Sequence, residues 1–197
     1  SPPQIAGPLT RLQCCPPTCG AAAAVVCSDE FARANGLTPR VAIAAQTLQS
    51  DSGDLFAEKS AMSLVGTDVT RNAARDVYQQ AGVDPPADIA VVELHDCFTV
   101  NEVLSYEALG LCDEGGAEKF ILDGDNTYGG RVVTNPSGGL LSKGHPLGAT
   151  GLAQTAEITW QLRGEAGDRQ VENATLGLQH NLGLGTAGVI TLFERLS

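Results

Sequence analysis

The chain has 197 residues, of which 43% are hydrophobic, and its formal net charge is −11. This length and composition are typical of a globular unit with a core, and no apolar run is long enough to span a bilayer. Because the chain is acidic and has no cluster of lysine or arginine, we do not expect it to bind nucleic acid or an anionic membrane.

Two elements are predicted near the N-terminus. Residues 20–27, Gly-Ala-Ala-Ala-Ala-Val-Val-Cys, form a run of small apolar side chains that predicts a buried strand. Ser28 is a typical N-cap for a short helix that continues to Asn35 and stops at Gly36. The chain lacks an initiator methionine, which suggests a fragment of a longer protein.

The six cysteines include no CxxC pair, and the first residues lack the basic and apolar regions of a signal peptide. We therefore expect reduced thiols and a cytoplasmic location. A zinc site built from Cys15, Cys19 and a histidine is a minor alternative, because this ligand spacing matches no known zinc pattern. We predict neither a metal nor a bound cofactor.

Strands and helices alternate from residue 41 onward. The expected elements are a strand at 41–48, a polar loop at 51–66, a helix at 68–80, a turn at 84–88, a strand at 89–94 and a helix from 99 to 111. In the first helix, Val69, Ala73 and Val77 form an apolar face at four-residue spacing, and Gly82 follows its end. Thr99 and Glu102 have the spacing of a capping box at the start of the second helix.

A glycine-rich stretch at 124–151 precedes the last three elements. A helix is expected to begin at Thr150 and to end before Gly164, with Leu152, Ala156 and Leu162 on one face. Two strands, at 174–179 and 187–193, complete the chain. The alternation of strands and helices predicts the α/β class.

One sequence match suggests a nucleotide site that the context excludes. Gly183-Leu-Gly-Thr-Ala-Gly188 fits the G-x-G-x-x-G pattern. This pattern binds a dinucleotide where it opens a helix in a βαβ unit, whereas a strand follows here. We therefore exclude NAD binding, and the absence of G-x-S-x-G removes the nucleophile elbow of an α/β-hydrolase.

All three histidines, His95, His145 and His180, lie at junctions between predicted elements. Ligands of open α/β sheets bind at the carboxyl ends of strands, so we expect these side chains to share a site. Cys97 follows His95 by two residues and precedes a helix, a position that lowers a thiol pKa. The alternative is three structural histidines and a small buried cysteine.

Four motifs occur in a fixed order and spacing: His95-Asp-Cys-Phe98, Gly124-Asp-Asn-Thr-Tyr-Gly-Gly130, Gly144-His-Pro146 within 135–151, and Gln179-His-Asn-Leu-Gly-Leu-Gly185. Together they resemble the sterol carrier protein type of thiolase. The resemblance implies a thiolase fold, in which two βαβαβαββ halves stack in five layers and the full-length chains form dimers or larger oligomers. Residues 41–197 resemble the whole C-terminal half with its mixed five-stranded sheet, and residues 1–40 resemble the last strand and helix of the N-terminal half.

The resemblance implies an acyltransferase that cleaves a 3-oxoacyl-CoA, with a fatty or sterol side chain, by free coenzyme A. Coenzyme A is then a substrate, and the products are acetyl- or propionyl-CoA and a shortened acyl-CoA. Breaking a carbon–carbon bond beside a thioester leaves an enolate, which needs hydrogen-bond donors at the developing oxyanion.

The same resemblance implies roles for individual residues. His145 activates the nucleophilic cysteine and polarises a thioester oxygen, and His95 supports that oxyanion site. Cys97 is the acid and base that protonates the leaving enolate. Asn181 and Gly183 contribute to a second oxyanion site.

Two departures from the family pattern keep alternatives open. None of the six cysteines lies in a motif that matches the family's nucleophile, which belongs to the N-terminal half, and Cys19 stands where relatives have aspartate. His180 is either part of the second oxyanion site or structural. A steroid side-chain acyl-CoA aldolase on the same fold is one alternative, although the retained Cys97 argues against it. The other is a non-catalytic lipid-transfer or scaffold protein.

Overall fold

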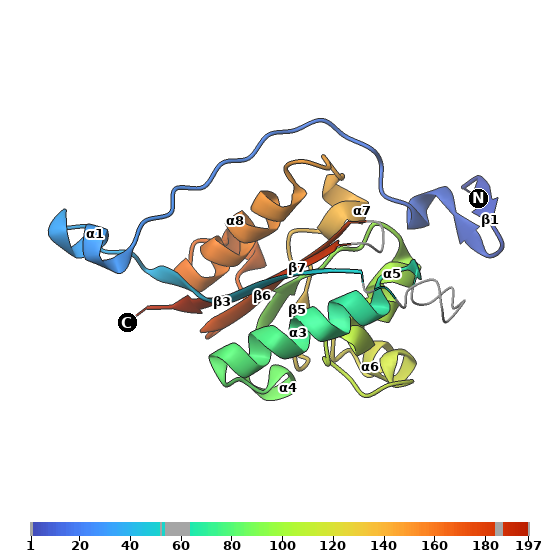
Figure 1. The fold of residues 1–197 in the computed structure, drawn as a ribbon. Helices are drawn as coiled ribbons and strands as arrows, with labels where there is room; N and C mark the ends of the chain where they lie inside the picture. The colour runs from blue at the N-terminus through green and yellow to red at the C-terminus, as the bar shows by residue number, and fades with distance from the viewer. Residues whose placement is uncertain (1, 52, 54–63, 184–186, 197) are drawn as a thin grey trace.

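A mixed five-stranded sheet lies at the centre of the computed structural model, which describes residues 2–51, 53, 64–183 and 187–196 (Figure 1). The strands are β3 (Val41–Ser50), β4 (Val91–Glu93), β5 (Val133–Thr134), β6 (Leu176–Gly183) and β7 (Ala187–Arg195). Their order is β3-β7-β6-β4-β5. β4 is parallel to β5 and β6, and β7 is antiparallel to β3 and β6.

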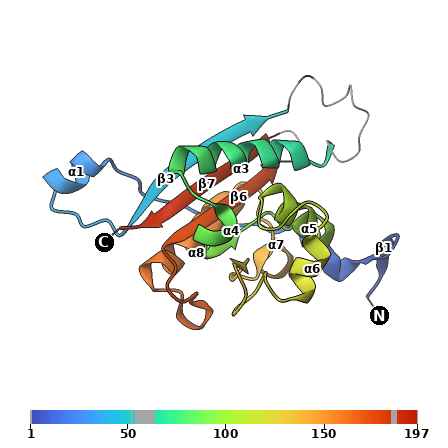
Figure 2. The ribbon, with the colours of Figure 1, turned by 90° about the horizontal axis from the view of Figure 1, so that it is seen from below.

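Helices cover both faces of this sheet (Figures 1 and 2). They are α3 (Thr67–Ala81), α4 (Pro85–Asp88), α5 (Thr99–Ala108), α6 (Ala117–Leu122), α7 (Gly139–Lys143) and α8 (Thr150–Arg163). One core cluster joins α3, α5 and α6 to the sheet, and a second joins α8 to the opposite face. From β3 onward the element order is βαβαβαββ, so the predicted fold class is confirmed.

Helix α3 forms as its sequence pattern predicts. Val69, Ala73 and Val77 are buried against the sheet. Gly82 ends the helix with a φ of 67°, a left-handed conformation in which glycine has no Cβ to clash. The loop predicted at 51–66 lies mostly outside the described residues.

The predicted cap of α5 is wrong. Phe98 occupies the N-cap position, and no side chain caps the helix. Glu102 instead accepts a hydrogen bond from the Tyr106 hydroxyl at 2.6 Å. A capping box requires the threonine backbone to be extended, whereas Thr99 is already the first helical residue.

Helix α8 has the predicted bounds but buries a different face. Of the predicted apolar face only Leu162 is buried, and Leu152 is exposed. The buried side includes Gln154, Glu157 and Gln161. These polar side chains can be buried because each one has a hydrogen-bond partner, so apolar spacing alone did not identify the inner face.

The N-terminal residues lie outside the central sheet. Strands β1 (Gln4–Ala6) and β2 (Leu9–Thr10) form a hairpin, followed by a 3-10 turn (Arg11–Gln13) and, further along, by helix α1 (Asp29–Ala34). Ser28 caps α1 by accepting the Phe31 N–H at 3.1 Å, as predicted. Figure 1 shows the connecting chain passing over α7 and α8 as an extended arc.

The strand predicted at residues 20–27 is wrong. These residues are extended but pair with no strand, and all of them are exposed. A strand needs a hydrogen-bonding neighbour, and small side chains bury too little apolar surface to hold the segment against a sheet edge.

Between β4 and α8, the elements α6, β5 and α7 were not predicted, and neither were β1, β2 and the two 3-10 turns, Arg11–Gln13 and Gly167–Arg169. Each of these elements is too short to show a detectable periodicity. The turn expected at 84–88 forms the single-turn helix α4. Within the described part of the chain, no helix combines the length and the apolar character that crossing a membrane requires.

Candidate functional site

The site forms where β4 ends beside β6. The two strands are parallel, and Glu93 pairs with Gln179. This register brings His95, two residues beyond β4, next to His180 and Asn181. Both of these residues lie inside β6, and not in the loop that the sequence suggested. The pairing of β6 with β7 extends the strand through Gly183 and explains this difference.

His95 is held by the side chain of Asn181. The ring Nδ1 lies 2.8 Å from Asn181 Oδ1, and because that oxygen can only accept, Nδ1 donates the hydrogen. The ring is buried, which lowers its pKa to about 4, and the nearby His145 lowers it further, while the bond to Asn181 opposes this shift. His95 is therefore neutral at pH 7, with its Nε2 lone pair available to accept a hydrogen bond.

His180 supports His95 from beneath. It is completely buried, and its Nδ1 accepts the backbone N–H of His95 at 3.5 Å. Its Nε2 must then carry the hydrogen and donate to Thr70 Oγ1 at 3.1 Å. Burial lowers the His180 pKa to about 3, so the ring stays neutral. This geometry favours the structural role for His180.

His145 enters the site from the glycine loop. Its backbone N–H donates to Pro16 O at 3.3 Å, and its ring lies edge-to-face with the ring of His95, with centroids 4.9 Å apart at 87°. Thr150 Oγ1 donates to Pro146 O at 3.1 Å and lies 2.7 Å from His145 Nδ1. The hydroxyl hydrogen is thereby used, so Nδ1 donates to it and Nε2 is the basic atom of His145. Burial lowers the His145 pKa, which also favours the neutral base.

Cys97 lies at the same junction, but its predicted pKa shift is wrong. The thiol pKa is raised to about 11, mainly by burial and also by Cys15 and Asp96. Backbone N–H groups at the start of α5 act in the opposite direction but contribute less. The Cys15 N–H donates to Cys97 O at 2.9 Å, so the N-terminal segment covers the turn. Desolvation thus outweighs the helix N-terminus.

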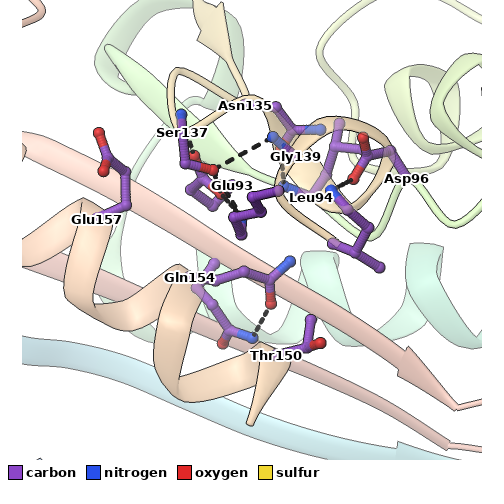
Figure 3. A network of polar contacts seen from close by, with 12 residues as sticks. Glu93, Leu94, Asp96, Asn135, Ser137, Gly139, Thr150, Gln154 and Glu157 are labelled. Carbon is purple, nitrogen blue, oxygen red and sulfur yellow. Dashed lines mark hydrogen bonds and ion pairs between the residues drawn. The ribbon is translucent and has the colours of Figure 1, made fainter. Parts of the chain in front are cut away.

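Two buried carboxylates near the site escaped the sequence reasoning. Glu93 accepts the N–H and hydroxyl of Ser137 at 3.0 and 2.7 Å and pairs with Lys143 at 3.2 Å (Figure 3). Asp96 accepts the Leu140 N–H at 2.7 Å. A signal for Glu93 was present, since a charged residue inside an apolar strand must be paired to be buried.

The glycines of the loop allow close contacts that no other residue permits. A Cβ on Gly139 would lie 2.1 Å from Asp96 Oδ2, and a Cβ on Gly151 would lie 2.8 Å from Asn181 Nδ2. With any other residue at these positions, the side chains of Asp96 and Asn181 would have to shift, and at Gly139 the positive φ of 61° also favours glycine.

Gly183 is the last residue of β6 and is exposed. Residues 184–186 lie outside the described chain, so the second oxyanion site stays a prediction. Gly188, the last residue of the excluded G-x-G-x-x-G pattern, lies in strand β7, as expected. Among the residues that the structure describes, no three histidine, cysteine or acidic side chains are grouped to hold a metal.

Comparisons with known proteins agree with this geometry. The model of the family described as Thiolase C-terminal domain-like matches residues 55–194. Sterol carrier protein 2 of Rattus norvegicus is 59% identical over 187 residues, which cover 94% of this chain and 34% of the relative. Acetyl-CoA acetyltransferase of Methanothermobacter thermautotrophicus is 44% identical over 193 residues, covering 97% of this chain and 49% of that protein.

A solved structure shows the same fold. The Ltp2-ChsH2(DUF35) aldolase superposes with a TM-score of 0.77 at 24% identity, over 98% of this chain and 49% of that chain. The chain thus spans between a third and a half of the length of these proteins. Because the family model matches well over half of the sequence, the chain belongs to the thiolase C-terminal domain-like family.

Proposed function

We propose that this chain is the C-terminal part of a thiolase-type acyltransferase that cleaves a 3-oxoacyl-CoA by free coenzyme A. The observation that supports this most is the state of His145. Its Nδ1 is occupied by Thr150, and its neutral Nε2 is the basic atom beside His95. A base in this state can take the proton of a nucleophilic thiol. In this proposal the nucleophilic cysteine comes from a part of the protein outside residues 1–197.

The reaction divides into two halves. His145 Nε2 takes the proton of the nucleophilic cysteine, whose thiolate attacks the 3-oxo carbon. The protonated His145 then donates a hydrogen bond to the developing oxyanion. Neutral His95 contributes through a water molecule, which donates one hydrogen bond to His95 Nε2 and the other to the oxyanion. When the bond between C2 and C3 breaks, the Cys97 S–H bond gives its proton to the enolate carbon. The Cys97 thiolate next takes the proton of the incoming coenzyme A thiol, whose sulfur attacks the acyl-enzyme carbonyl. The nucleophilic cysteine leaves as a thiolate and recovers its proton from His145, which completes the cycle.

The raised pKa of Cys97 suits these two steps. With a pKa of about 11 the side chain is a thiol at pH 7, so it can donate a proton to the enolate. The thiolate formed in that step is a strong base, so it readily deprotonates the next coenzyme A thiol. This argument supports acid and base chemistry at Cys97 and not a nucleophilic role.

The proposal includes the division of the chain and the form of the whole protein. Residues 1–40 would end the N-terminal half of a thiolase, and residues 41–197 would form its C-terminal domain. An acyl-CoA with a fatty or sterol chain would be the substrate, and the full-length protein would be a homodimer or larger oligomer. The relatives support the family of reactions and do not define the acyl chain.

Two substitutions in the full-length protein test the assignment of roles. Cys97→Ala should still form an acyl-enzyme from a short acyl-CoA, because coenzyme A can leave as a thiolate, but should lose proton exchange at the α-carbon of acetyl-CoA. His145→Ala should lose acylation itself, because the nucleophile is no longer deprotonated. Each loss should be about 10²–10⁴-fold in rate. Mass spectrometry of the trapped acyl-enzyme and deuterium wash-in report the two steps separately.

The same measurements separate the alternatives. Normal proton exchange in Cys97→Ala would remove Cys97 from catalysis and favour a lyase on this fold. A wild-type protein that neither acylates nor exchanges protons would favour a non-catalytic lipid-transfer protein.

A further inference from the structure

Asp96 is a buried carboxylate between two residues of the proposed site, His95 and Cys97, and is 2% exposed. The Asp96 carboxylate forms no hydrogen bond with the side chain of either residue. Its oxygens instead accept the backbone N–H groups of Leu140 at 2.7 Å and Leu141 at 3.4 Å. Asp96 therefore joins the turn after β4 to the first turn of α7, 44 residues further along the chain.

The neighbouring glycine shows how closely these parts are fitted. Gly139 has a φ of 61°, and a Cβ there would lie 2.1 Å from Asp96 Oδ2. Figure 3 shows Asp96 and Gly139 side by side at the start of α7. The helix ends at Lys143, two residues before His145. The carboxylate thus connects a residue adjacent to Cys97 with the helix that leads directly to His145.

On the basis of the proposed function, we propose that Asp96 is a positioning residue: it fixes the turn that carries Cys97 to the helix leading to His145, and its negative charge adds to the effect of burial in opposing formation of the Cys97 thiolate. The first part follows from the two hydrogen bonds and from the space that Gly139 leaves. The second part follows from the position of a carboxylate one residue before the thiol, because a like charge opposes formation of the thiolate.

The charge of Asp96 itself depends on pH. Burial raises its pKa to about 6, the Leu140 and Leu141 N–H groups oppose that shift, and the carboxylate of Glu102 on α5 adds to it. Asp96 is therefore mostly ionised at pH 7 and neutral at pH 5. Since it raises the Cys97 pKa only while ionised, the reactivity of Cys97 should show a second titration near pH 6.

The other titratable groups at this junction are Cys15, His95 and His145. Cys15 also has a pKa raised by burial and by Asp96. His95, with a pKa of about 4, titrates below the window of interest. His145 has a pKa lowered by burial, and its ring lies against His95, so it is the group from which Asp96 must be distinguished.

Rates of thiol modification in the full-length protein measure this effect. The probe is methyl methanethiosulfonate between pH 5 and 9, with peptide mass spectrometry to follow Cys97, Cys15 and Cys112 separately. For wild type we expect the logarithm of the Cys97 modification rate to rise with pH along two parallel lines, which are offset from each other by a shoulder near pH 6. Asp96→Asn should remove the shoulder and make Cys97 react about threefold faster at pH 8, since half a pKa unit changes the thiolate fraction about threefold.

Cys112 provides an internal control in the same sample. Its pKa is raised by burial and by Glu107, and Asp96 is not among the charges that act on it. Its rate should be the same in wild type and Asp96→Asn, whereas Glu107→Gln should accelerate Cys112 and leave Cys97 unchanged. In the thiolysis assay, Asp96→Asn should lower kcat and leave KM unchanged, because it disturbs the proton donor and not the substrate contacts.

Each other outcome is informative. A shoulder that persists in Asp96→Asn would belong to His145 and would overturn the proposal. A wild-type profile without a shoulder would overturn it as well.

If all three cysteines become equally reactive in Asp96→Asn, this variant has unfolded, and Glu102→Gln is the deciding variant. Removing the Glu102 charge should move the shoulder to lower pH, and an unmoved shoulder would overturn the proposal. A wild-type protein with the shoulder but without thiolysis would refute the proposed function and leave the effect of Asp96 on Cys97 in place.

Discussion

Residues 20–27 and residues 89–94 are both short apolar runs, but they end in opposite surroundings. In the first run every residue is exposed, and Val25 is 101% exposed. In the second, Val92 is completely buried, and β4 pairs with β5 on one edge and with β6 on the other. Apolar composition therefore permits a strand, whereas hydrogen-bonding neighbours along its edges determine whether the strand forms and which residues it positions.

The largest expected effect comes from pH, because ionisable histidine rings are buried beside the end of the second region. The His180 pKa is about 3 in the folded protein and about 6.5 when unfolded. A base with a lowered folded pKa contributes stability that is fully present above pH 6.5 and is lost as the pH falls toward the folded value. Between pH 6.5 and 4, wild type should lose about 3 kcal/mol of unfolding free energy relative to His180→Gln.

Urea unfolding of both proteins at pH 4, 5, 6 and 7 measures this difference. A difference in unfolding free energy that stays constant with pH would show that His180 is not held neutral by burial. Acid would then affect the stability of the buried residues at the end of β4 no more than that of the exposed residues 20–27.

A matched pair of valines tests the comparison directly. Val92→Ala should cost about 2 kcal/mol, because it deletes methyl groups from a filled core. Val25→Ala should change the unfolding free energy by less than about 0.5 kcal/mol, since the same methyl groups are exposed. Denaturant midpoints of the 197-residue chain check both values. Equal costs would contradict the comparison. In the full-length protein a large cost for Val25→Ala would support the proposed division of the chain at residue 40.

The smallest expected effect concerns two helix starts, one beside each region. Ser28→Ala should destabilise α1 by about 1 kcal/mol, because Ser28 Oγ accepts the Phe31 N–H. Thr99→Ala should cost less than about 0.5 kcal/mol, because no side chain caps α5. Hydrogen exchange at the amides of Phe31 and of Asn101 reports each helix locally. A larger change at Asn101 than at Phe31 would restore the capping box that the sequence suggested.

The order of strands and helices could be predicted from the sequence because it depends on local patterns. Val69, Ala73 and Val77 repeat at helical spacing, and Gly82 and Gly164 mark helix ends by their backbone freedom. The meeting of the histidines could also be predicted, since the carboxyl ends of parallel strands share one edge of a sheet.

The details that failed depend on contacts distant in sequence. The inner face of α8 is polar because Gln154 reaches His180 O and Glu157 reaches Arg169, and apolar spacing cannot reveal such partners. The Cys97 pKa was predicted with the wrong sign because the local argument considered the helix that follows and omitted burial under the N-terminal segment. Asp96 was overlooked because its partners lie 44 residues away.

The raised pKa of Cys97 also has a consequence for oxidative damage. Peroxides and electrophiles attack the thiolate, and with a pKa of about 11 only about one Cys97 side chain in 10⁴ is a thiolate at pH 7. Cys19 and Cys27 are exposed on the N-terminal arc, far along the chain from this turn. An oxidant in the surrounding solution therefore meets these two cysteines first, and the burial that keeps Cys97 protonated also protects it from oxidation.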